Sequence, residues 1–214
     1  MKTLDLKKQF KHLYQPSARK PEILKVPKLQ FAMIDGAIEN GKEPGNSPGF
    51  AEAAQALYSI SYTLKFTLKK RKTNPIDYPV MALERLWWVE NGIFDINVKD
   101  NYVYTLMIMQ PNAITHELFE EAREQVRKKK GDFLSLSNVR LADFEEGMCV
   151  QIMHIGPYAT EPATVEVMRA YALENGYRDN VGPNGKHHEI YIGNPLKAAP
   201  EKLKTVLRHP LEKI

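Results

Sequence analysis

The sequence predicts an α+β fold in which two duplicated strand–helix–strand–strand modules form a mostly antiparallel sheet, with helices on one face and a central ligand cleft. Two observations support this prediction. Strand-like and helix-like patterns follow one another in the same order in both halves of the chain. Short segments also correspond between the halves, residues 33–36 with 153–156 and Glu43-Pro44 with Glu161-Pro162. We expect the cleft on the pseudo-two-fold axis between the modules, on the sheet face opposite the helices.

The length and composition fit one domain with an extension at its N-terminus. A chain of 214 residues, 43% hydrophobic and 26% charged, can bury such a core without a disulfide or a structural metal. Residues 1–26 are basic and lack periodicity, and we expect them to lie across the domain as an N-terminal arm. Residues 27–214 are expected to form the domain, with pseudo-symmetric halves at about 27–110 and 146–214 joined by a helical connector.

The first half contains a strand, a long helix and two further strands. An apolar run predicts the first strand over residues 29–36. A helix is expected over 48–70, because a Ser-Pro pair supplies its N-cap and first residue and apolar residues then recur at helical spacing. Runs rich in aromatic and β-branched residues predict strands over 80–89 and 102–109, with a turn at Asn91-Gly92 between them.

The same kinds of sequence signal predict the connector and the second half. Thr115 is a suitable N-cap for a helix that reaches residue 130. The second half repeats the order of the first, as a strand, a helix that ends at an Asn-Gly pair, and two strands. These elements are expected over residues 148–155, 163–175, 186–192 and 205–211. For the last of them, the alternative is that a helix begun at Pro200 takes up the start of the strand.

The charge pattern does not favour a nucleic-acid partner. The net charge is +4 and the isoelectric point is near 9.0, and such a basic balance can indicate nucleic-acid binding. Basic residues cluster in the first 28 residues, at 69–72 and at 127–130. The last two clusters end predicted helices, where cations complement the helix dipole. Cys149 is the only cysteine and lies in an apolar strand, which predicts a core residue.

No targeting segment, metal motif or cofactor motif is evident. No apolar run reaches the length of about 20 residues that a transmembrane helix needs, and the first residues are too charged for a signal peptide. We therefore expect a cytoplasmic protein without membrane contact. The neighbours His187 and His188 point apart on a strand, so no metal is expected. Phosphate loops and dinucleotide fingerprints do not occur, so no cofactor is expected.

Alternation along the strand at 186–192 sorts its residues into two groups. His188 and Ile190 share one face, which we expect to meet the helix layer, whereas Glu189 and Tyr191 then face the cleft. A carboxylate in an apolar cleft has a raised pKa and can serve as a general acid or base, or as a counter-ion for a cationic ligand. The alternative is a rim glutamate paired with an arginine.

Trp87 and Trp88 are the second group of candidates. Adjacent residues of a strand point to opposite faces, so one tryptophan can pack in the core while the other lines the cleft and stacks on a flat ligand. Glu84 shares a face with Trp88 and is a second carboxylate candidate. Core packing of both tryptophans is the alternative.

Three tyrosines and a histidine complete the candidates. Tyr58 and Tyr62 lie one turn apart on the first helix, beside its apolar face, and packing at the core edge is the alternative role. Tyr158 and His154 lie at the corner where the strand at 148–155 ends, from which they could reach the cleft.

Two groups of motifs carry a resemblance to a known family. The segment 154–158 before a helix, and His188-Glu189-Ile190-Tyr191 before Pro195, resemble the GyrI-like small-molecule-binding domain, which is built from two strand–helix–strand–strand modules. Segments at 78–88, 102–108 and 199–208 resemble a stand-alone subgroup known as cyclopropanoid cyclopropyl hydrolases.

The resemblance implies a function and roles for the candidates. Such domains bind flat hydrophobic, aromatic or cationic molecules in a central cleft, and the hydrolytic members add water to a strained cyclopropane. On this basis Glu189 deprotonates the attacking water, and Tyr158 or Tyr58 donates a hydrogen bond to the ligand carbonyl. The residues expected to bind the ligand are Trp87, Trp88, Glu84, Tyr62, Tyr191 and His154.

Two other functions compete with hydrolysis. The first is a non-catalytic module that sequesters drugs or, by family analogy, contacts DNA gyrase. The second is nucleic-acid binding through the basic clusters, which predicts a steep salt dependence of affinity.

Overall fold

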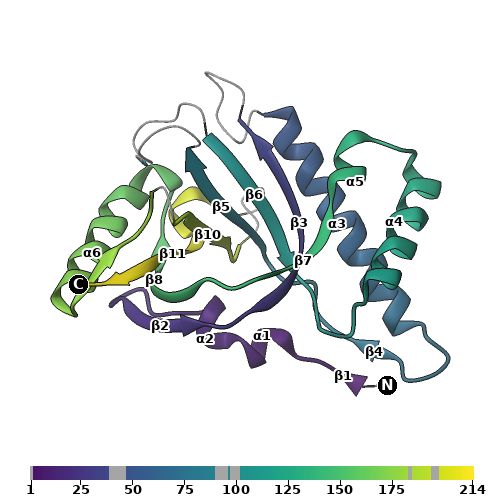
Figure 1. The fold of residues 1–214 in the computed structure, drawn as a ribbon, viewed down its shortest axis with the longest axis horizontal. Coiled ribbons are helices and arrows are strands. Elements are labelled where there is room, and N and C mark those ends of the chain that lie inside the picture. Colours follow the sequence, from purple (N-terminus) through teal and green to yellow (C-terminus); the bar gives the residue numbers. More distant parts are fainter. Residues whose placement is uncertain (1, 39–46, 90–95, 97–101, 183–184, 194–197) are drawn as a thin grey trace.

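A large antiparallel sheet organises the molecule (Figure 1). The structure is a computed structural model that describes residues 2–38, 47–89, 96, 102–182, 185–193 and 198–214. Within these residues the sheet has nine strands. Glu43-Pro44 and Asn91-Gly92, on which part of the sequence prediction rested, lie outside the described residues.

The first module has the predicted order of elements. It consists of β3 (Leu29–Ala37), α3 (Pro48–Lys69), β5 (Leu83–Val89) and β6 (Tyr102–Met109). The Ser47 side chain caps α3 by accepting a hydrogen bond from the backbone N–H of Phe50. The predicted apolar face of this helix is buried, including Leu57, Ile60 and Leu64. The one clear difference is that β5 begins at Leu83 and not at residue 80.

The second module repeats the first. It consists of β8 (Gly147–Ile155), the 3-10 turn η2 (Tyr158–Thr160), α6 (Glu161–Glu174), β10 (His187–Tyr191) and β11 (Lys204–Lys213). Helix α6 begins at Glu161, two residues before the predicted start. The chain at Pro200 forms only a short 3-10 turn, η3 (Pro200–Lys202), so the last element is the strand and not a helix.

The strand order reflects the duplication. The modules contribute the series β8-β11-β10 and β3-β6-β5, and β10 pairs with β5 in the middle of the sheet. At the edges lie β2 (Glu22–Val26), which pairs with β8, and β7 (Arg140–Phe144), which pairs with β3. A short strand, β9 (Tyr177–Asp179), pairs with the end of β11. The sequence pattern did not predict β2, β7 or β9.

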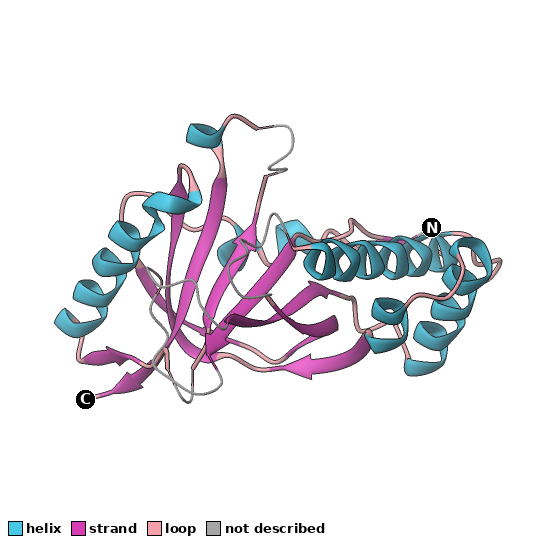
Figure 2. Ribbon diagram, turned by 90° about the horizontal axis from the view of Figure 1, so that it is seen from above, coloured by secondary structure: helices cyan, strands magenta, loops and turns pink. Residues whose placement is uncertain are grey.

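Helices α3 and α6 pack on the same face of the sheet, on either side of the central strands (Figures 1 and 2). This face also carries Glu189. Its partner across β10 and β11, Leu207, packs with Val165 and Met168 of α6. On the other side Tyr104, which pairs with Trp87, contacts the Phe50 ring of α3 at 5.3 Å. The expectation that the site lies on the helix-free face is therefore wrong.

The opposite face is contacted by the N-terminal segment. This segment contains β1 (Lys2–Thr3), α1 (Leu6–Gln9) and α2 (Lys11–Tyr14), and β1 pairs with β4 (Ile76–Asp77). The Tyr14 hydroxyl donates a hydrogen bond of 2.5 Å to Glu84, which is the cross-strand partner of Ile190. His188 and Ile190 thus point toward the N-terminal segment and not toward the helix layer, which corrects the sequence prediction. A second apolar layer was available on this face, so Ile190 did not need α3 or α6 to be buried.

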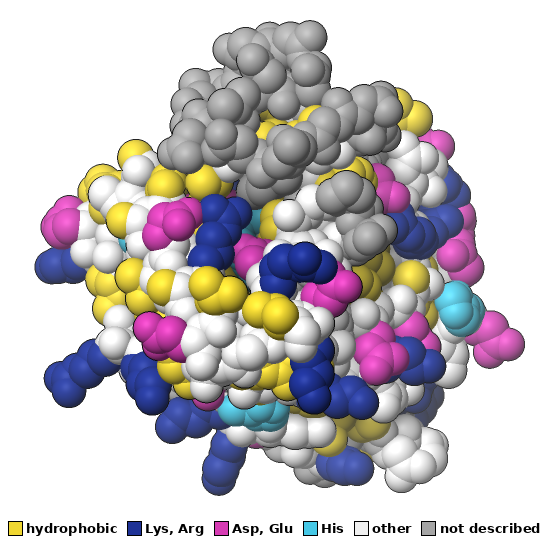
Figure 3. Space-filling view, turned by 60° about the vertical axis from the view of Figure 1, so that its left-hand side comes forward, with side chains coloured by type: hydrophobic (Ala, Val, Ile, Leu, Met, Phe, Trp, Pro, Cys, Tyr) yellow, Lys and Arg dark blue, Asp and Glu magenta, His cyan; other side chains and the backbone are white. Residues whose placement is uncertain are grey.

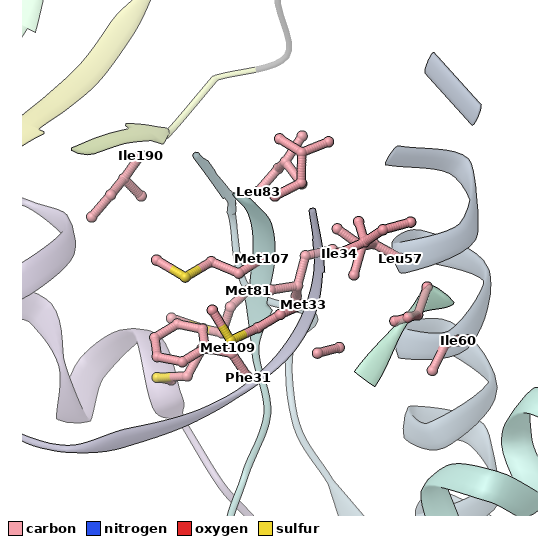
Figure 4. Close-up of a cluster of buried hydrophobic side chains, with 14 of the residues drawn as sticks. Phe31, Met33, Ile34, Leu57, Ile60, Met81, Leu83, Met107, Met109 and Ile190 are labelled. Carbon is pink, nitrogen blue, oxygen red and sulfur yellow. The ribbon is translucent and has the colours of Figure 1, made fainter. Parts of the chain in front are cut away.

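The core extends on both sides of the sheet. Figure 4 shows Leu57 and Ile60 of α3 facing Ile34, whereas Met107, Met109 and Ile190 lie on the other side of the strands. Cys149 is fully buried, as predicted, and burial raises the pKa of its thiol.

The connector contains α4 (His116–Lys130) and α5 (Leu134–Asn138). The Thr115 side chain caps α4 as predicted, by accepting from the backbone N–H of Leu118. The basic clusters at 69–72 and 127–130 fall at the ends of α3 and α4, where the sequence analysis placed them. Among the described residues, no helix has the length and apolarity needed to cross a bilayer.

Candidate functional site

The Glu189 carboxylate lies at the centre of the sheet, between the two modules. It is 4% exposed and its oxygens have four side-chain partners. Arg85 and the Tyr191 hydroxyl each donate to Oε2 at 2.5 Å. The Trp87 indole donates to Oε1 at 2.9 Å, and His187 Nε2 lies 3.2 Å from the same oxygen.

Strand pairing brings these residues together. Glu189 and Arg85 are direct partners across β10 and β5, and His187 pairs with Trp87. The Arg85 guanidinium also stacks over the Trp87 ring at 3.5 Å, with the Tyr191 ring at 5.2 Å. One ion pair is therefore enclosed by aromatic side chains from both modules.

Glu189 is ionised. Burial alone would raise its pKa, but the positive charge of Arg85 and the hydrogen bonds of His187 and Tyr191 outweigh burial and lower the pKa to about 2. The sequence analysis expected a raised pKa because it assigned Glu189 an apolar cleft without a cation. The arginine partner, which it kept as an alternative, is present, although the pair is buried and not at a rim.

Glu161 is a second buried carboxyl group next to Glu189. It is the first residue of α6 and 3% exposed, and its Oε1 has no hydrogen-bond partner among the described residues. Ligand atoms of Glu161, His187 and Glu189 lie within 4.8 Å of one another. Burial and the neighbouring Glu189 charge raise the pKa of Glu161 to about 9, so Glu161 carries a proton at neutral pH.

The sequence analysis used Glu161 only as a landmark of the repeat. The available signal was the Glu161-Pro162 pair, which the sequence analysis aligned with Glu43-Pro44 in the first half of the chain. A carboxyl group at a helix start ordinarily points to solvent, where it complements the helix dipole. Only the contact between α6 and the central strands buries this one.

The two carboxyl groups therefore differ in protonation state. Glu189 can accept a proton or bind a cationic group, and Glu161 can donate a proton. Glu161, His187 and Glu189 also have the donor atoms of a metal site, but Arg85 and Trp87 already occupy the oxygens of Glu189. The arrangement favours proton transfer over metal binding.

Tyr158 and Tyr191 lie on the side of the site that approaches solvent. Their rings are 5.9 Å apart, and Tyr158 is 40% exposed whereas Tyr191 is half-buried. Burial and the Glu189 charge raise the pKa of Tyr158, so its hydroxyl remains a hydrogen-bond donor at neutral pH. Among the sequence candidates, Tyr158, Tyr191 and Trp87 thus gather around Glu189.

Trp88 and Glu84 lie on the other face of the sheet. Trp88 is half-buried, with the Lys186 ammonium 3.5 Å from its ring centroid. Glu84 accepts from Tyr14 and contacts His188 at 3.1 Å. The structure does not bring either residue to Glu189, and of the two tryptophans it is Trp87 that lies in the site.

His154 supports the corner after β8. Its Nδ1 lies 2.8 Å from the Thr164 hydroxyl and its Nε2 lies 3.2 Å from the Pro157 carbonyl. Burial lowers its pKa, so the ring is neutral at neutral pH. Gly156, within this corner, has a φ of 140°, which other residues rarely adopt. His154 thus orients the turn that carries Tyr158.

Tyr58 and Tyr62 lie farther along α3. They stack at 6.4 Å and are 38% and 48% exposed. Phe50, whose ring lies 5.5 Å from the Arg85 guanidinium, precedes Tyr58 by two helical turns, or about 12 Å of helix. The two tyrosines therefore lie beyond the aromatic side chains around Glu189. Figure 3 shows the α6 side of the molecule, where hydrophobic side chains alternate with charged ones.

A buried ion pair, a neutral carboxyl group and aromatic rings thus meet at the junction of the two modules, which makes this junction the candidate site. The family comparison gives the class of protein. The model of the GyrI-like small molecule binding domain matches residues 19–212, and the chain belongs to this family. No match was found among curated protein sequences.

Several solved structures are similar along the full chain. A hydrolase from Listeria innocua encoded by lin2189 is 41% identical, with a TM-score of 0.84 over 99% of this chain and 100% of that one. An uncharacterized conserved protein from Listeria innocua is 40% identical, with a TM-score of 0.86 over 98% and 100% of the two chains. The C-terminal domain of EcmrR is 12% identical, with a TM-score of 0.52 over 91% and 98%, and is similar in fold alone.

Proposed function

We propose that this protein binds a flat hydrophobic molecule with a strained cyclopropane and opens that ring by adding water. The observation that carries the proposal is the pair of buried carboxyl groups, Glu189 ionised and Glu161 protonated, enclosed by aromatic side chains. Environments that separate the pKa values of two adjacent acids are typical of acid–base catalysis. Two similar proteins from Listeria innocua, 39% and 41% identical, are hydrolases, which supports the same reaction class.

The proposed reaction is one addition of water. The water oxygen attacks a cyclopropane carbon, and the carbon–carbon bond to the conjugated ring system breaks. Its electron pair moves to the conjugated carbonyl oxygen, which takes the proton of Glu161. Glu189 takes a proton from the attacking water, and the product carries the added hydroxyl group. One proton then returns from the base to Glu161, so the reaction consumes water and nothing else.

Glu189 is a weak base before the attack because Arg85 and Tyr191 stabilise its charge. The water oxygen becomes strongly acidic once its bond to carbon forms, so the proton transfer becomes favourable late in the step. Ring strain supplies part of the driving force. The hydrogen bonds to Glu189 hold the carboxylate in one orientation, which lowers the entropic cost of the attack.

Aromatic side chains and a tyrosine bind the ligand in this proposal. Tyr158 is the candidate to donate a hydrogen bond to the ligand carbonyl, where negative charge develops. It is partly exposed to solvent, and its ring lies next to that of Tyr191, which contacts Glu189. Trp87 and Tyr191 offer faces for a flat ring system. Tyr58 and Tyr62 are candidates for contacts with the distal part of a long ligand.

The test is mass spectrometry of a cyclopropane-bearing DNA-alkylating drug after incubation with the protein. We expect the water adduct to form much more slowly with Glu189→Gln and Glu161→Gln than with the wild type, while all three proteins retain the ligand. Glu120→Gln, an exposed change on α4, serves as the control and should leave the adduct unchanged. Recovery of unchanged drug bound to the wild type would contradict hydrolysis and favour a module that only sequesters its ligand.

A further inference from the structure

A chain of buried ionisable side chains, linked by short contacts between their polar atoms, leads away from Glu189 on the side opposite Tyr158. His187 Nε2 lies 3.2 Å from Glu189, and His187 Nδ1 lies 2.6 Å from Nε2 of His209. Nδ1 of His209 lies 2.8 Å from Oδ2 of Asp179. Both histidines are 1% exposed, and the Asp179 side chain is 11% exposed.

Strand pairing aligns the members of this chain. His187 is in β10, His209 is in β11, and Asp179 is in β9, which pairs with the end of β11. The Arg169 side chain of α6 donates to Asp179 at 2.9 Å and is itself 40% exposed. The chain therefore runs from the buried carboxylate of the site toward the protein surface.

Counting protons shows what the chain can do. Three gaps separate the four groups, and each gap needs one proton to become a hydrogen bond. Two neutral imidazoles supply only two protons, and both carboxylates at the ends are acceptors. With neutral rings, one gap lacks a proton. The gap between His187 and Glu189 is the longest of the three, at 3.2 Å.

Burial and the two carboxylates act in opposite directions on an additional proton in the histidine pair. Burial lowers the pKa of His187 to about 4, with further lowering from His209 and Arg85 and opposition from Glu189. The pKa of Asp179 is lowered despite its burial, because His209, the Val181 N–H and Arg169 stabilise its charge. Glu161 faces His187 from α6 and is neutral. A proton added to the histidine pair would lie between two ionised carboxylates.

We propose that His187 and His209, anchored by Asp179, hold the proton that Glu189 takes from the attacking water. The proton moves from Glu189 to Nε2 of His187, and all three gaps then contain a hydrogen bond. Glu189 returns to its ionised form, and the proton goes back through it to Glu161 when the product leaves. This inference rests on the proposed hydrolysis, and it explains how a carboxylate paired with arginine can act as a base. The two histidines and Asp179 act through Glu189 and are positioning residues.

The first test compares Asp179→Asn with Arg178→Gln, a control in the same strand whose side chain is 68% exposed. Loss of the Asp179 charge should lower kcat about tenfold and move the ascending limb of the pH–rate profile to lower pH, because the histidine pair then holds its proton less firmly, with KM unchanged. The control should behave like the wild type. An Asp179→Asn variant with the wild-type kcat and pH profile would overturn the proposal that the two histidines hold the proton. It would not contradict the proposed hydrolysis.

The second test needs no turnover. Nitrogen NMR of the imidazole rings in the intact protein should show His187 and His209 taking up one shared proton as the pH falls, with the second uptake strongly opposed. Asp179→Asn should lower the pH of that shared uptake. Two rings that titrate independently, or an uptake unaffected by Asp179→Asn, would overturn the proposal. If the wild type shows the shared proton but never forms a water adduct, the proposed hydrolysis is contradicted, whereas the shared proton of His187 and His209 is confirmed.

Discussion

Two buried polar networks lie on opposite faces of the same central strands, and they differ in how fully their groups are paired. One lies between the sheet and the N-terminal segment and includes Glu84, Glu146, His188 and Arg208. The other lies between the sheet and helices α3 and α6 and includes Glu189, Glu161, His187 and Arg85. Both contain two glutamates, a histidine and an arginine, and in each network three of these four residues come from the central strands β5, β10 and β11.

In the network on the N-terminal side, both carboxylates have several partners. Glu84 accepts from Tyr14 and contacts His188, and Glu146 contacts His188 at 3.0 Å and Arg208 at 3.3 Å. Burial would raise the pKa of Glu146, but His188 and Arg208 lower it to about 2. This network fastens the N-terminal segment to the sheet.

On the helix side, two buried polar atoms lack a hydrogen-bond partner among the described residues, Nε of Arg85 and Oε1 of Glu161. Native proteins rarely leave such groups unpaired, because each costs free energy of desolvation. The network on the N-terminal side is thus paired internally and serves structure, whereas the network on the helix side keeps two polar atoms that a ligand would pair in the proposed function.

The largest expected difference between the networks is in turnover. Glu189→Gln should reduce kcat by about 100-fold or more, because it removes the base. Glu84→Gln should lower stability, since it weakens the contact with His188 and Tyr14, but leave kcat within about twofold of the wild type. Steady-state kinetics at a temperature where both variants are folded distinguishes the two. A Glu84→Gln variant that folds normally and loses turnover would break the comparison.

A second difference should appear in the pH dependence of stability. The raised pKa of Glu161, about 9 against 4.5 in an unfolded chain, means that the folded state keeps a proton that the unfolded state releases. The free energy of unfolding should therefore fall as the pH rises from about 4.5 to about 9. Urea denaturation of Glu161→Gln should show a smaller fall, together with a kcat reduced about tenfold or more. An unchanged pH slope in the variant would mean that Glu161 is ionised.

His188 should give a smaller effect of stability alone. Burial would lower its pKa, but Glu146 and Glu84 raise it above 6.5. Its stabilising contribution is thus full below about pH 6.5 and is lost as the pH rises through the folded-state pKa. In urea denaturation, His188→Gln should be destabilised most at acidic pH, and its pH–rate profile should match the wild type. A shifted pH–rate profile would connect this network to the chemistry.

Among the candidate ligand-binding residues, the tyrosines should give the smallest losses of kcat. Tyr158→Phe should lower kcat by about tenfold through loss of one hydrogen bond to the developing oxyanion. Tyr62→Phe, a matched change at an exposed position of α3, should leave kcat unchanged. Kinetics with a substrate of minimal size provides the measurement. A loss in Tyr62→Phe with an unchanged kcat in Tyr158→Phe would place the ligand along α3 and not at Tyr158.

Local signals explain how much of the fold the sequence predicts. Ser47 and Thr115 mark helix starts by their capping side chains, and the repeated order of elements predicts the central strands. The edge strands β2 and β7 have weaker signals, since their residues are mixed in polarity and their pairing depends on long-range contacts. The prediction of which sheet face carries the site was also wrong. Alternation separates the two faces of β10, but it does not say which elements cover each face.

The site is predictable only in part for the same reason. Glu189 and Tyr191 follow from strand alternation and family resemblance, which left open whether Trp87 or Trp88 lies with them. Arg85 and Glu161 come from a second strand and from a helix start, and only strand register and helix packing bring them within reach of Glu189. The sign of the Glu189 pKa shift depends on Arg85, so it could not be derived from β10 alone.

The most direct test of the account is the protonation state of the two site carboxyl groups at neutral pH. Infrared difference spectroscopy of the wild type against Glu161→Gln and Glu189→Gln reports protonated and ionised carboxyl groups separately. We predict that Glu161→Gln removes a protonated carboxyl signal and that Glu189→Gln removes an ionised one. Loss of an ionised signal from Glu161→Gln would contradict the paired acid and base on which the proposed hydrolysis depends.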